Sequence, residues 1–200
     1  NAGAADGADS AAGKEVSGRK LRLLCLHDAG QSPQVFAKQL QAMFLNAREF
    51  RAHLEFVCME APLLISKEDA PADVQATCVL AGGEPGEWFR GGHDQDPRRP
   101  ELQLQRSAGA VAARLVEEGP WDGLCGFGQG GTVAATVARL AEEGHGLPEG
   151  LIRFLVLIDA AWPLGARLRP AAPLRTPSCH VFCADGAGRQ SDHEHLLLHW

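Results

Sequence analysis

The sequence predicts an α/β protein, a three-layer α/β/α sandwich with a mostly parallel sheet. Two observations predict this class: short apolar runs alternate with segments of helical periodicity, and the runs end in polar or glycine-rich clusters. Strands that are buried on both faces form nearly continuous apolar runs, and their alternation with helices is typical of a parallel sheet covered on both sides. With 200 residues, the chain is long enough for one domain with a substantial core.

Five apolar runs are predicted to be the strands. They cover residues 21–27, 54–60, 122–127, 152–159 and 178–185. Short apolar runs between turn residues favour buried strands over helices. Four cysteines lie inside these runs, so we expect their thiols to be buried and to pack as small hydrophobic groups. They are Cys25, Cys58, Cys125 and Cys183.

Three segments between the runs have apolar residues spaced three or four apart, which predicts amphipathic helices. The stripes are Val35, Phe36, Leu40, Met43 and Phe44; Leu104, Val111 and Leu115; and Val133, Val137 and Leu140. Ser32 stands before the first stripe and is a candidate helix cap. Residues 63–100 are rich in Gly, Pro and charged residues, which predicts a long loop of the kind that forms lids, binding surfaces or disordered segments. Within it, Trp88 and Phe89 are candidates for a pocket wall or for the anchors of a docking surface.

The composition excludes several classes of function. The net charge of −6, from 19 basic and 25 acidic residues, leaves no basic surface for a phosphate backbone, so no nucleic-acid partner is expected. No segment approaches the ~20 apolar residues of a membrane-spanning helix, so no direct membrane span is expected. The cysteines form no C-x-x-C pair, and residues 1–20 do not resemble a secretory signal because they have no apolar run. We therefore expect an intracellular location, in the cytoplasm or inside an organelle. Residues 1–20 are predicted to be a disordered or linker arm, and residues 21–200 the folded domain.

Polar residues follow the predicted strands at the point where each strand ends. The first ends in His27-Asp28-Ala29-Gly30, the second in Glu60-Ala61-Pro62, the third in Gly128-Gln129, the fourth in Asp159 and the fifth in Asp185-Gly186. In open α/β sheets, ligands bind outside the carboxyl ends of the strands. We therefore expect these clusters to converge on one rim of the sheet.

Four segments in order resemble the FSH family of small serine hydrolases. Residues 21–32 read Leu-Arg-Leu-Leu-Cys-Leu-His-Asp-Ala-Gly-Gln-Ser, residues 54–62 read Leu-Glu-Phe-Val-Cys-Met-Glu-Ala-Pro, residues 88–89 read Trp-Phe, and residues 119–131 read Gly-Pro-Trp-Asp-Gly-Leu-Cys-Gly-Phe-Gly-Gln-Gly-Gly. They are similar to the family's oxyanion loop, its second strand, its tryptophan-containing loop and its nucleophile elbow. The resemblance implies a compact α/β-hydrolase fold with its site on the rim described above.

The sequence departs from the family's pattern at the positions that carry the chemistry. Gly128 stands where the resemblance places the nucleophilic serine, and Asp28 replaces the glycine of the oxyanion loop, where a carboxylate would repel a developing oxyanion. The family's catalytic aspartate aligns with Gly186, one residue after Asp185. The family's histidine and final strand would follow Trp200, so we expect a C-terminally incomplete domain that lacks the last strand.

These departures predict a catalytically inactive hydrolase-like domain, a pseudoenzyme with a structural, binding or assembly role in a larger complex. No catalytic residue and no cofactor are expected. A sheet that lacks its last strand has an unpaired edge that a protein partner can cover. His27 is expected to brace the turn by hydrogen-bonding the backbone. The expected remnant of the pocket is His27, Asp28, Gly30, Trp88, Gly128, Gln129 and Asp185.

Two other functions are compatible with the sequence. The first is an active esterase or thioesterase with an unrecognised nucleophile, for which Cys125 is the candidate, although a packing role is favoured because it lies within a strand. The second is dinucleotide binding, because Gly126, Gly128 and Gly131 satisfy G-x-G-x-x-G between a strand and a helix, with Asp159 as the acidic partner.

A metal site is not expected either. Three histidines lie close together near the end of the chain, but only two of them share a helix face, and a zinc site needs three or four ligands. They are His193, His195 and His199.

Overall fold

The five predicted apolar runs form one parallel sheet. The computed structural model describes residues 18–44, 48–66, 69–90, 98–145, 147–148, 150–161 and 173–182. Within them, the strands lie in the order β2-β1-β5-β6-β7, and every neighbouring pair is parallel. The bounds are β1 Leu21–Leu26, β2 Leu54–Met59, β5 Gly123–Phe127, β6 Phe154–Ile158 and β7 Ser178–Val181. The part of the fifth predicted run beyond residue 182 lies outside the described residues.

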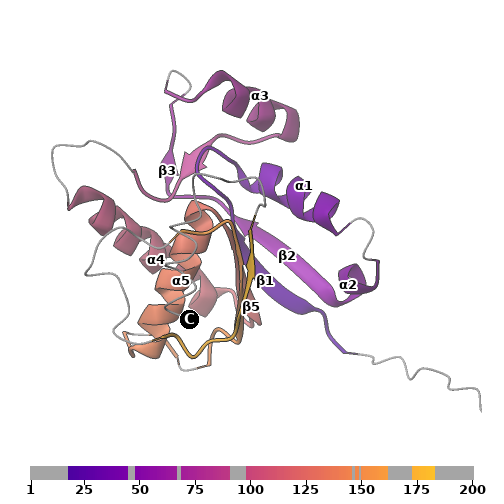
Figure 1. Cartoon of the computed structure of the whole chain (residues 1–200), viewed down its shortest axis with the longest axis vertical. Coiled ribbons are helices and arrows are strands. Elements are labelled where there is room, and N and C mark those ends of the chain that lie inside the picture. The colour runs from indigo at the N-terminus through magenta and orange to yellow at the C-terminus, as the bar shows by residue number, and fades with distance from the viewer. Residues whose placement is uncertain are drawn as a thin grey trace, which may run out of the picture.

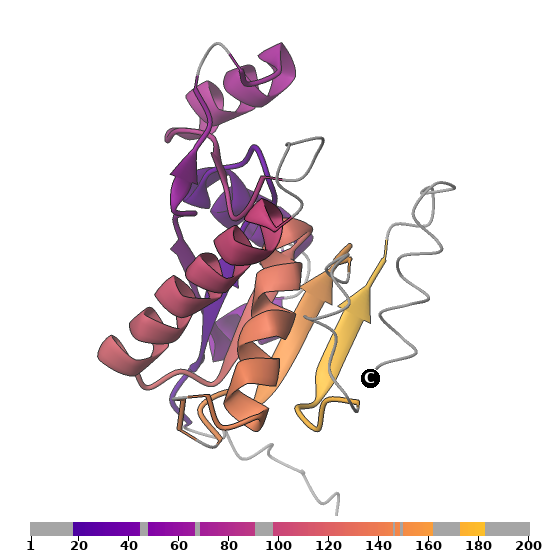
Figure 2. The same ribbon diagram turned by 90° about the vertical axis from the view of Figure 1, so that its left-hand side faces the viewer.

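Helices cover the sheet on both faces, which confirms the predicted three-layer α/β/α class. Figures 1 and 2 show α4 (Arg99–Glu117) and α5 (Gln129–Glu142) on one face and α1 (Pro33–Met43) on the other. Successive side chains of a strand point to opposite faces. Accordingly, Leu24 and Leu26 pack in the cluster under α4 and α5, whereas Leu23 and Cys25 pack in the cluster with α1.

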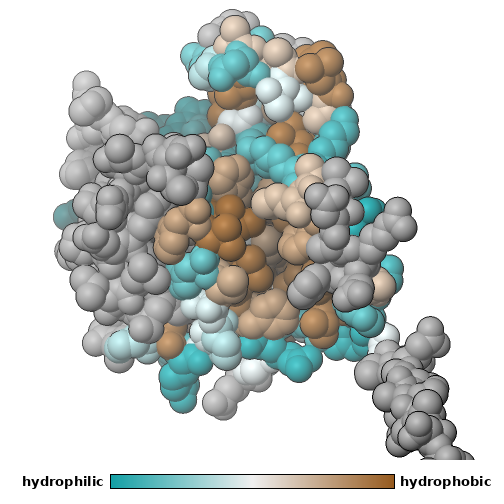
Figure 3. All heavy atoms as spheres, turned by 45° about the vertical axis from the view of Figure 1, so that its right-hand side comes forward, coloured by the Kyte–Doolittle hydropathy of each residue, from teal (hydrophilic) through white to brown (hydrophobic). Residues whose placement is uncertain are grey.

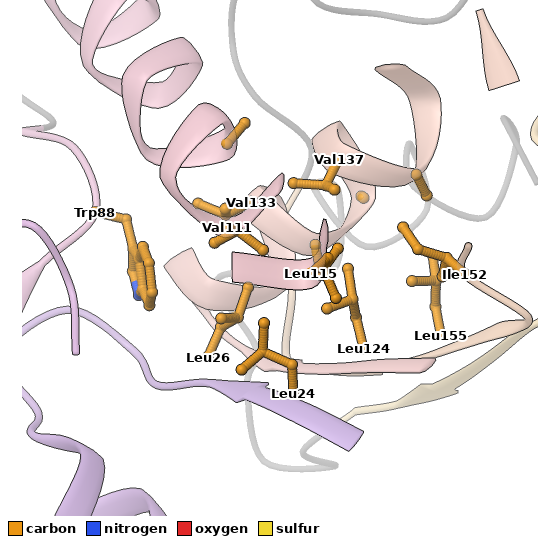
Figure 4. Close-up of a cluster of buried hydrophobic side chains, with 14 of the residues drawn as sticks. Leu24, Leu26, Trp88, Val111, Leu115, Leu124, Val133, Val137, Ile152 and Leu155 are labelled. Atoms are coloured by element: carbon orange, nitrogen blue, oxygen red, sulfur yellow. The ribbon is translucent and has the colours of Figure 1, made fainter. Parts of the chain in front are cut away.

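The larger cluster lies between the sheet and the helices α4 and α5. Figure 4 shows leucines of β1, β5 and β6 directed at Val111 and Leu115 of α4 and at Val133 and Val137 of α5. These four helix residues are 0–1% exposed. Burying a side chain of this size contributes about 1.5–3 kcal/mol. Helix α5 is buried along most of its length and is thereby held in a fixed position directly after β5.

The smaller cluster lies on the α1 side of the sheet. Cys25 on β1 stands in register with Cys58 on β2 and Cys125 on β5, so three thiols form a row across adjacent strands. Phe36 of α1 stacks on Phe127, with the ring centroids 6.1 Å apart. Figure 3, which views the molecule from this side, shows hydrophobic residues gathered in the middle of the face. Half-buried side chains that pack against this cluster include Phe127, Phe154, Val156 and Ile158.

The expectation of a long loop over residues 63–100 is wrong for much of the segment. Strands β3 (Leu63–Leu64) and β4 (Gly86–Glu87) pair antiparallel, and α3 (Ala72–Ala81) lies between them in sequence. Helix α3 has no apolar stripe, because Val79 and Leu80 are 79% and 83% exposed and Cys78 is its buried residue. Its sequence therefore carries no helical periodicity. The short helix α2 (Arg48–His53) was missed for the same reason.

The predicted helical stripes lie on α1, α4 and α5. Ser32 caps α1 as expected, since its Oγ accepts a hydrogen bond from the N–H of Val35 at 3.2 Å. Met43 is an exception, because its side chain is 51% exposed at the end of α1. The first-strand prediction also extended one residue too far: β1 ends at Leu26, and His27 belongs to the rim.

A buried carboxylate joins the amino ends of three strands. Asp122, just before β5, accepts hydrogen bonds from both terminal nitrogens of Arg19 at 2.6 and 2.8 Å, from the N–H of Arg22 at 2.8 Å and from Arg153 at 2.8 Å. Hydrogen bonding by Arg19 lowers the pKa of Asp122 below its ordinary value. Arg19, which falls in the predicted arm, is thus held against the domain. The first 17 residues of that arm lie outside the described residues.

Candidate functional site

The carboxyl ends of β1 and β5 meet at one rim, as the strand-end clusters predict. His27 and Asp28 follow β1, and Gly128 and Gln129 follow β5. The segment after β4, with Trp88, lies against both turns, because Trp88 bonds to His27 and to Gln129. Six of the seven expected pocket residues therefore lie together on the rim, counting Gly30. The seventh, Asp185, lies outside the described residues, as do Gly186 and the three histidines near the end of the chain.

Gly128 forms the turn between β5 and α5. Its φ of 52° and ψ of −117° place it at the N-cap of α5 in a conformation that side chains rarely adopt. Its N–H donates to the carbonyl of Ile158 at 2.9 Å, which fixes the turn against β6. A Cβ at this position would lie 2.0 Å from Oδ1 of Asp28, far inside van der Waals contact. Position 128 thus has the strained backbone of a nucleophile elbow, and in this chain a side chain there would also collide with Asp28.

The Asp28 carboxylate is hydrogen-bonded to the two turns of the rim. Its Oδ1 accepts a hydrogen bond from the N–H of Gln129 at 2.8 Å and another from the N–H of Ala29 at 2.8 Å. Gln129 is the first residue of α5. The N-terminal end of a helix favours a negative charge, because its first N–H groups have no partner within the helix. The carboxylate therefore satisfies the first N–H of α5.

His27 has both ring nitrogens engaged with the backbone. Its Nε2 lies 3.2 Å from the N–H of Ala61, which can only donate, so Nε2 is the unprotonated acceptor. The proton on Nδ1 is then donated to the carbonyl of Asp28 at 2.7 Å. Burial lowers the pKa of His27, which keeps the ring neutral. A histidine held in this way braces the turn between β1 and the following loop.

Gln129 fastens the segment after β4 to the turn. Its Oε1 accepts from the N–H of Trp88 at 3.0 Å, and its Nε2 donates to the carbonyl of Phe89 at 2.9 Å. Ser107 of α4 donates to the Trp88 carbonyl, and the Trp88 indole N–H donates to the carbonyl of His27 at 2.7 Å. Trp88 is fully buried. The docking role considered for Trp88 is therefore wrong, because the whole indole is enclosed by the chain itself.

Close backbone contacts account for the other glycines around the turn. A Cβ on Gly126 would lie 2.5 Å from the carbonyl oxygen of Gly130, and one on Gly131 would lie 2.4 Å from Cβ of Ala160. A Cβ on Gly130 would lie 2.2 Å from the carbonyl oxygen of Leu26. Gly30, with a φ of 78°, donates its N–H to Gly86. These glycines let α5 begin directly against β1 and β5.

The candidate thiol Cys125 does not lie at the rim, whereas the buried Cys78 of α3 donates to the carbonyl of Gly30 at 3.6 Å. Cys125 is 2% exposed within β5 and packs in the cluster on the α1 side. The described residues contain no group of three histidine, cysteine or acidic side chains arranged to hold a metal ion. Among the helices within the described ranges, none is both long and apolar enough to cross a membrane.

The strand, turn and helix that carry Gly128 have the arrangement of a hydrolase elbow. Comparison with known protein families shows to which hydrolase family the chain belongs. The model of the serine hydrolase (FSH1) family matches residues 16–195. The chain belongs to the FSH1 family. The resemblance stated from the motifs of residues 21–131 is thereby confirmed.

Relatives of this FSH1 chain include proteins named as esterases. Human esterase OVCA2 is 31% identical over 179 residues, which covers 82% of this chain and 75% of that protein. Esterase OVCA2 of Danio rerio is 28% identical over 183 residues, 85% of this chain and 79% of that protein. Among solved structures, acyl-protein thioesterase 2 of Zea mays aligns with a TM-score of 0.50 at 22% identity, covering 76% of this chain and 61% of the maize chain. This likeness shows the α/β-hydrolase fold.

The contact between Asp28 and Gln129 is the feature of the site that sequence reasoning missed. The sequence pointed to Gly128 and to Asp28 as two separate departures, one that removes a nucleophile and one that repels an oxyanion. The structure shows that they are neighbours, and that the carboxylate is bound. The sequence did contain a signal for this contact, namely that both departures occur in the same chain. A larger residue at 28 together with a smaller one at 128 suggests that the side chain of Asp28 fills the space left at 128.

Proposed function

We propose that this FSH1 domain is catalytically inactive and has a structural or assembly role. One observation supports the proposal above the others: the turn that would present a nucleophile carries Gly128, and its first helical N–H is bound by the Asp28 carboxylate. Acyl transfer requires an activated nucleophile and N–H donors that are open to the oxyanion. In this chain the turn provides neither.

The expected loss of rate is large. Removing the serine from a serine protease lowers kcat by about 2 × 10⁶, and the residual activity comes from the oxyanion hole and substrate binding. Here the donors behind that residual activity already hold a carboxylate. Residual hydrolysis should therefore lie below that of a serine-deleted enzyme whose oxyanion hole is open.

An esterase that uses Cys125 instead has little support from its surroundings. Reactive cysteines are partly exposed and lie near positive charge. Cys125 is buried in β5 next to Cys25, whose own pKa is raised by burial. A thiol in this row packs the sheet and has no access to a substrate at the rim.

Dinucleotide binding through Gly126, Gly128 and Gly131 is also not favoured. In a dinucleotide site, the glycines let the backbone approach a pyrophosphate at the start of a helix. In this chain Gly126 lies close to the backbone of the following helix, and Gly131 lies close to Ala160. The Asp28 carboxylate accepts a hydrogen bond from the first N–H of α5. A carboxylate at that point repels a phosphate.

Hydrolysis of short-chain esters tests the proposal. We expect purified protein to hydrolyse p-nitrophenyl acetate and an acyl thioester no faster than buffer, with human esterase OVCA2 assayed beside it. The Cys125→Ala variant should give the same result as the native chain. Turnover by the native chain that increases with protein concentration would contradict the proposal, and its loss in Cys125→Ala would identify the thiol as the nucleophile.

The assembly role is supported by the edges of the sheet. Among the described strands, β2 and β7 are the outermost strands of the sheet, and an outermost strand is where another chain can pair. We expect the protein in cell extract to elute with partner proteins, at a mass well above that of a single chain. Elution of the full-length protein as a monomer would contradict the assembly role.

A further inference from the structure

The two N–H groups that hold the Asp28 carboxylate have the positions of an oxyanion hole. In α/β-hydrolases this hole consists of the N–H of the residue after the nucleophile and an N–H from a loop at the strand ends. Gln129 follows Gly128, and Ala29 belongs to the loop after β1. Both donate to one atom, Oδ1 of Asp28, at 2.8 Å. A single oxygen between two backbone donors is the arrangement in which an oxyanion is stabilised.

The position of the carboxylate depends on the absence of a side chain at residue 128. A Cβ on Gly128 would lie 2.0 Å from Oδ1, 2.1 Å from Cγ and 2.6 Å from Oδ2 of Asp28. Outside its own residue and the two chain neighbours, a real Cβ essentially never has another heavy atom within 3.0 Å. Any side chain at 128 therefore requires the carboxylate to move from its position against the two N–H groups. The bound position of the Asp28 carboxylate and a side chain at residue 128 are therefore incompatible.

We propose that the Asp28 carboxylate is a tethered occupant of the oxyanion hole, and that Gly128 is the residue this occupancy requires. The chemical class that the hole accepts is then a small carboxylate, supplied in this chain from within. The inference rests on the proposed function only in taking the turn as a former acyl-transfer site. It adds that the site is closed by a ligand of its own, so that restoring serine alone cannot reopen it.

A double-mutant cycle measures the mutual exclusion directly. Gly128→Ser lowers stability through backbone strain whichever residue stands at 28. When Asp28 is present, the substitution also displaces its carboxylate, which lowers stability further. We expect Gly128→Ser to lower Tm by about 4 °C more in the native background than in Asp28→Gly, since about 1 kcal/mol corresponds to roughly 2–4 °C for a chain of this size. Asp28→Asn keeps the bulk of the side chain, so Gly128→Ser should cost as much in that background as in the native one.

A matched control separates strain from exclusion. Gly144 also has a positive φ, 75°, and nothing lies within 4 Å of a Cβ built on it. Gly144→Ser should lower Tm by the same amount with Asp28 and with Asp28→Gly. If Gly128→Ser is too unstable to purify, Gly128→Ala carries the same Cβ and completes the cycle. A difference below about 1 °C between the two backgrounds for residue 128 would overturn the exclusion.

Acetate tests whether the hole accepts carboxylates. Removal of the side chain in Asp28→Gly leaves two N–H donors open, so 100 mM acetate should raise Tm of this variant by about 2 °C above equal chloride, and should leave the native chain unchanged. An equal response of the two proteins would overturn the assignment of the hole as a carboxylate site. Neither measurement depends on activity. Ester turnover by the native chain would refute the proposed function but would leave the thermal coupling between residues 28 and 128 unaffected. Absence of that coupling would refute this inference but would leave the proposed inactivity unaffected.

Discussion

At the residue scale, His27 shows how the loops at the rim of the sheet are held together. The ring is buried, its two nitrogens bond to Ala61 and Asp28, and its backbone carbonyl accepts from the Trp88 indole. Removing the acceptor at Nε2 would leave a buried N–H unsatisfied, which costs about 1–3 kcal/mol. The histidine therefore stabilises the loops of the rim without needing to transfer a proton.

The lowered pKa of His27 gives a prediction for stability against pH. The unfolded chain binds a proton at this histidine as pH falls through about 6.5, while the folded chain does so only at a lower pH. The contribution of His27 is therefore complete above about pH 6.5 and declines as pH falls toward the folded pKa. Urea unfolding from pH 8 to pH 5 should show this decline in the native chain, and His27→Gln should be less stable at pH 8 with a flatter profile.

The control for this prediction is His180, whose pKa is also lowered by burial. The variant His180→Gln should keep the part of the pH dependence that belongs to His27. Equal profiles for the native chain and His27→Gln would show that the ring is not held neutral by its surroundings.

At the element scale, the sequence predicted the strands and helices that pack in the core and missed the elements that do not. The five strands and the helices α1, α4 and α5 carry apolar runs or stripes because each packs against the sheet, so their positions could be read directly from the pattern. Helix α3 lies away from the sheet with Val79 and Leu80 exposed, and the two-residue strands β3 and β4 are too short for a pattern. The contact of Asp28 with Gln129 joins residues 101 positions apart, which no local pattern encodes.

The amino ends of β1, β5 and β6 are joined at Asp122, and this predicts acid sensitivity. Hydrogen bonds from Arg19 lower the folded pKa of Asp122, so its contribution is present above the unfolded pKa of about 3.9 and is lost as pH falls through the folded value. Asp122→Asn should cost about 2 kcal/mol at pH 7, because hydrogen bonds to a charged group are lost. This difference, measured by urea unfolding, should shrink toward pH 3.

Glu55 provides the matched control for Asp122. It pairs with Arg22 at 3.5 Å, but its side chain is 51% exposed. Surface ion pairs contribute about 0–1 kcal/mol, so Glu55→Gln should change stability little at any pH. An Asp122→Asn variant as stable as Glu55→Gln would contradict the role given to the buried carboxylate.

At the scale of the whole molecule, the chain keeps the FSH1 frame and changes the contents of its site. The parallel sheet, the elbow and the buried α5 remain, and the family match spans residues 16–195. The rim residues bond to one another: Gln129 holds the Trp88 segment, His27 holds Asp28, and Asp28 holds Gln129. Through these hydrogen bonds the rim residues hold the two turns and the Trp88 segment together.

Labelling by a fluorophosphonate probe tests the central claim most directly, because the probe forms a covalent adduct with an activated serine or other nucleophile of a serine hydrolase whatever its substrate. Purified protein should be incubated with the probe and its intact mass measured, with human esterase OVCA2 treated in parallel. We predict that the esterase gains the mass of the adduct and that the native chain and its Gly128→Ser variant do not. An adduct on the native chain, located by peptide mapping to any residue of the rim, would contradict the claim that this site has shape without a nucleophile.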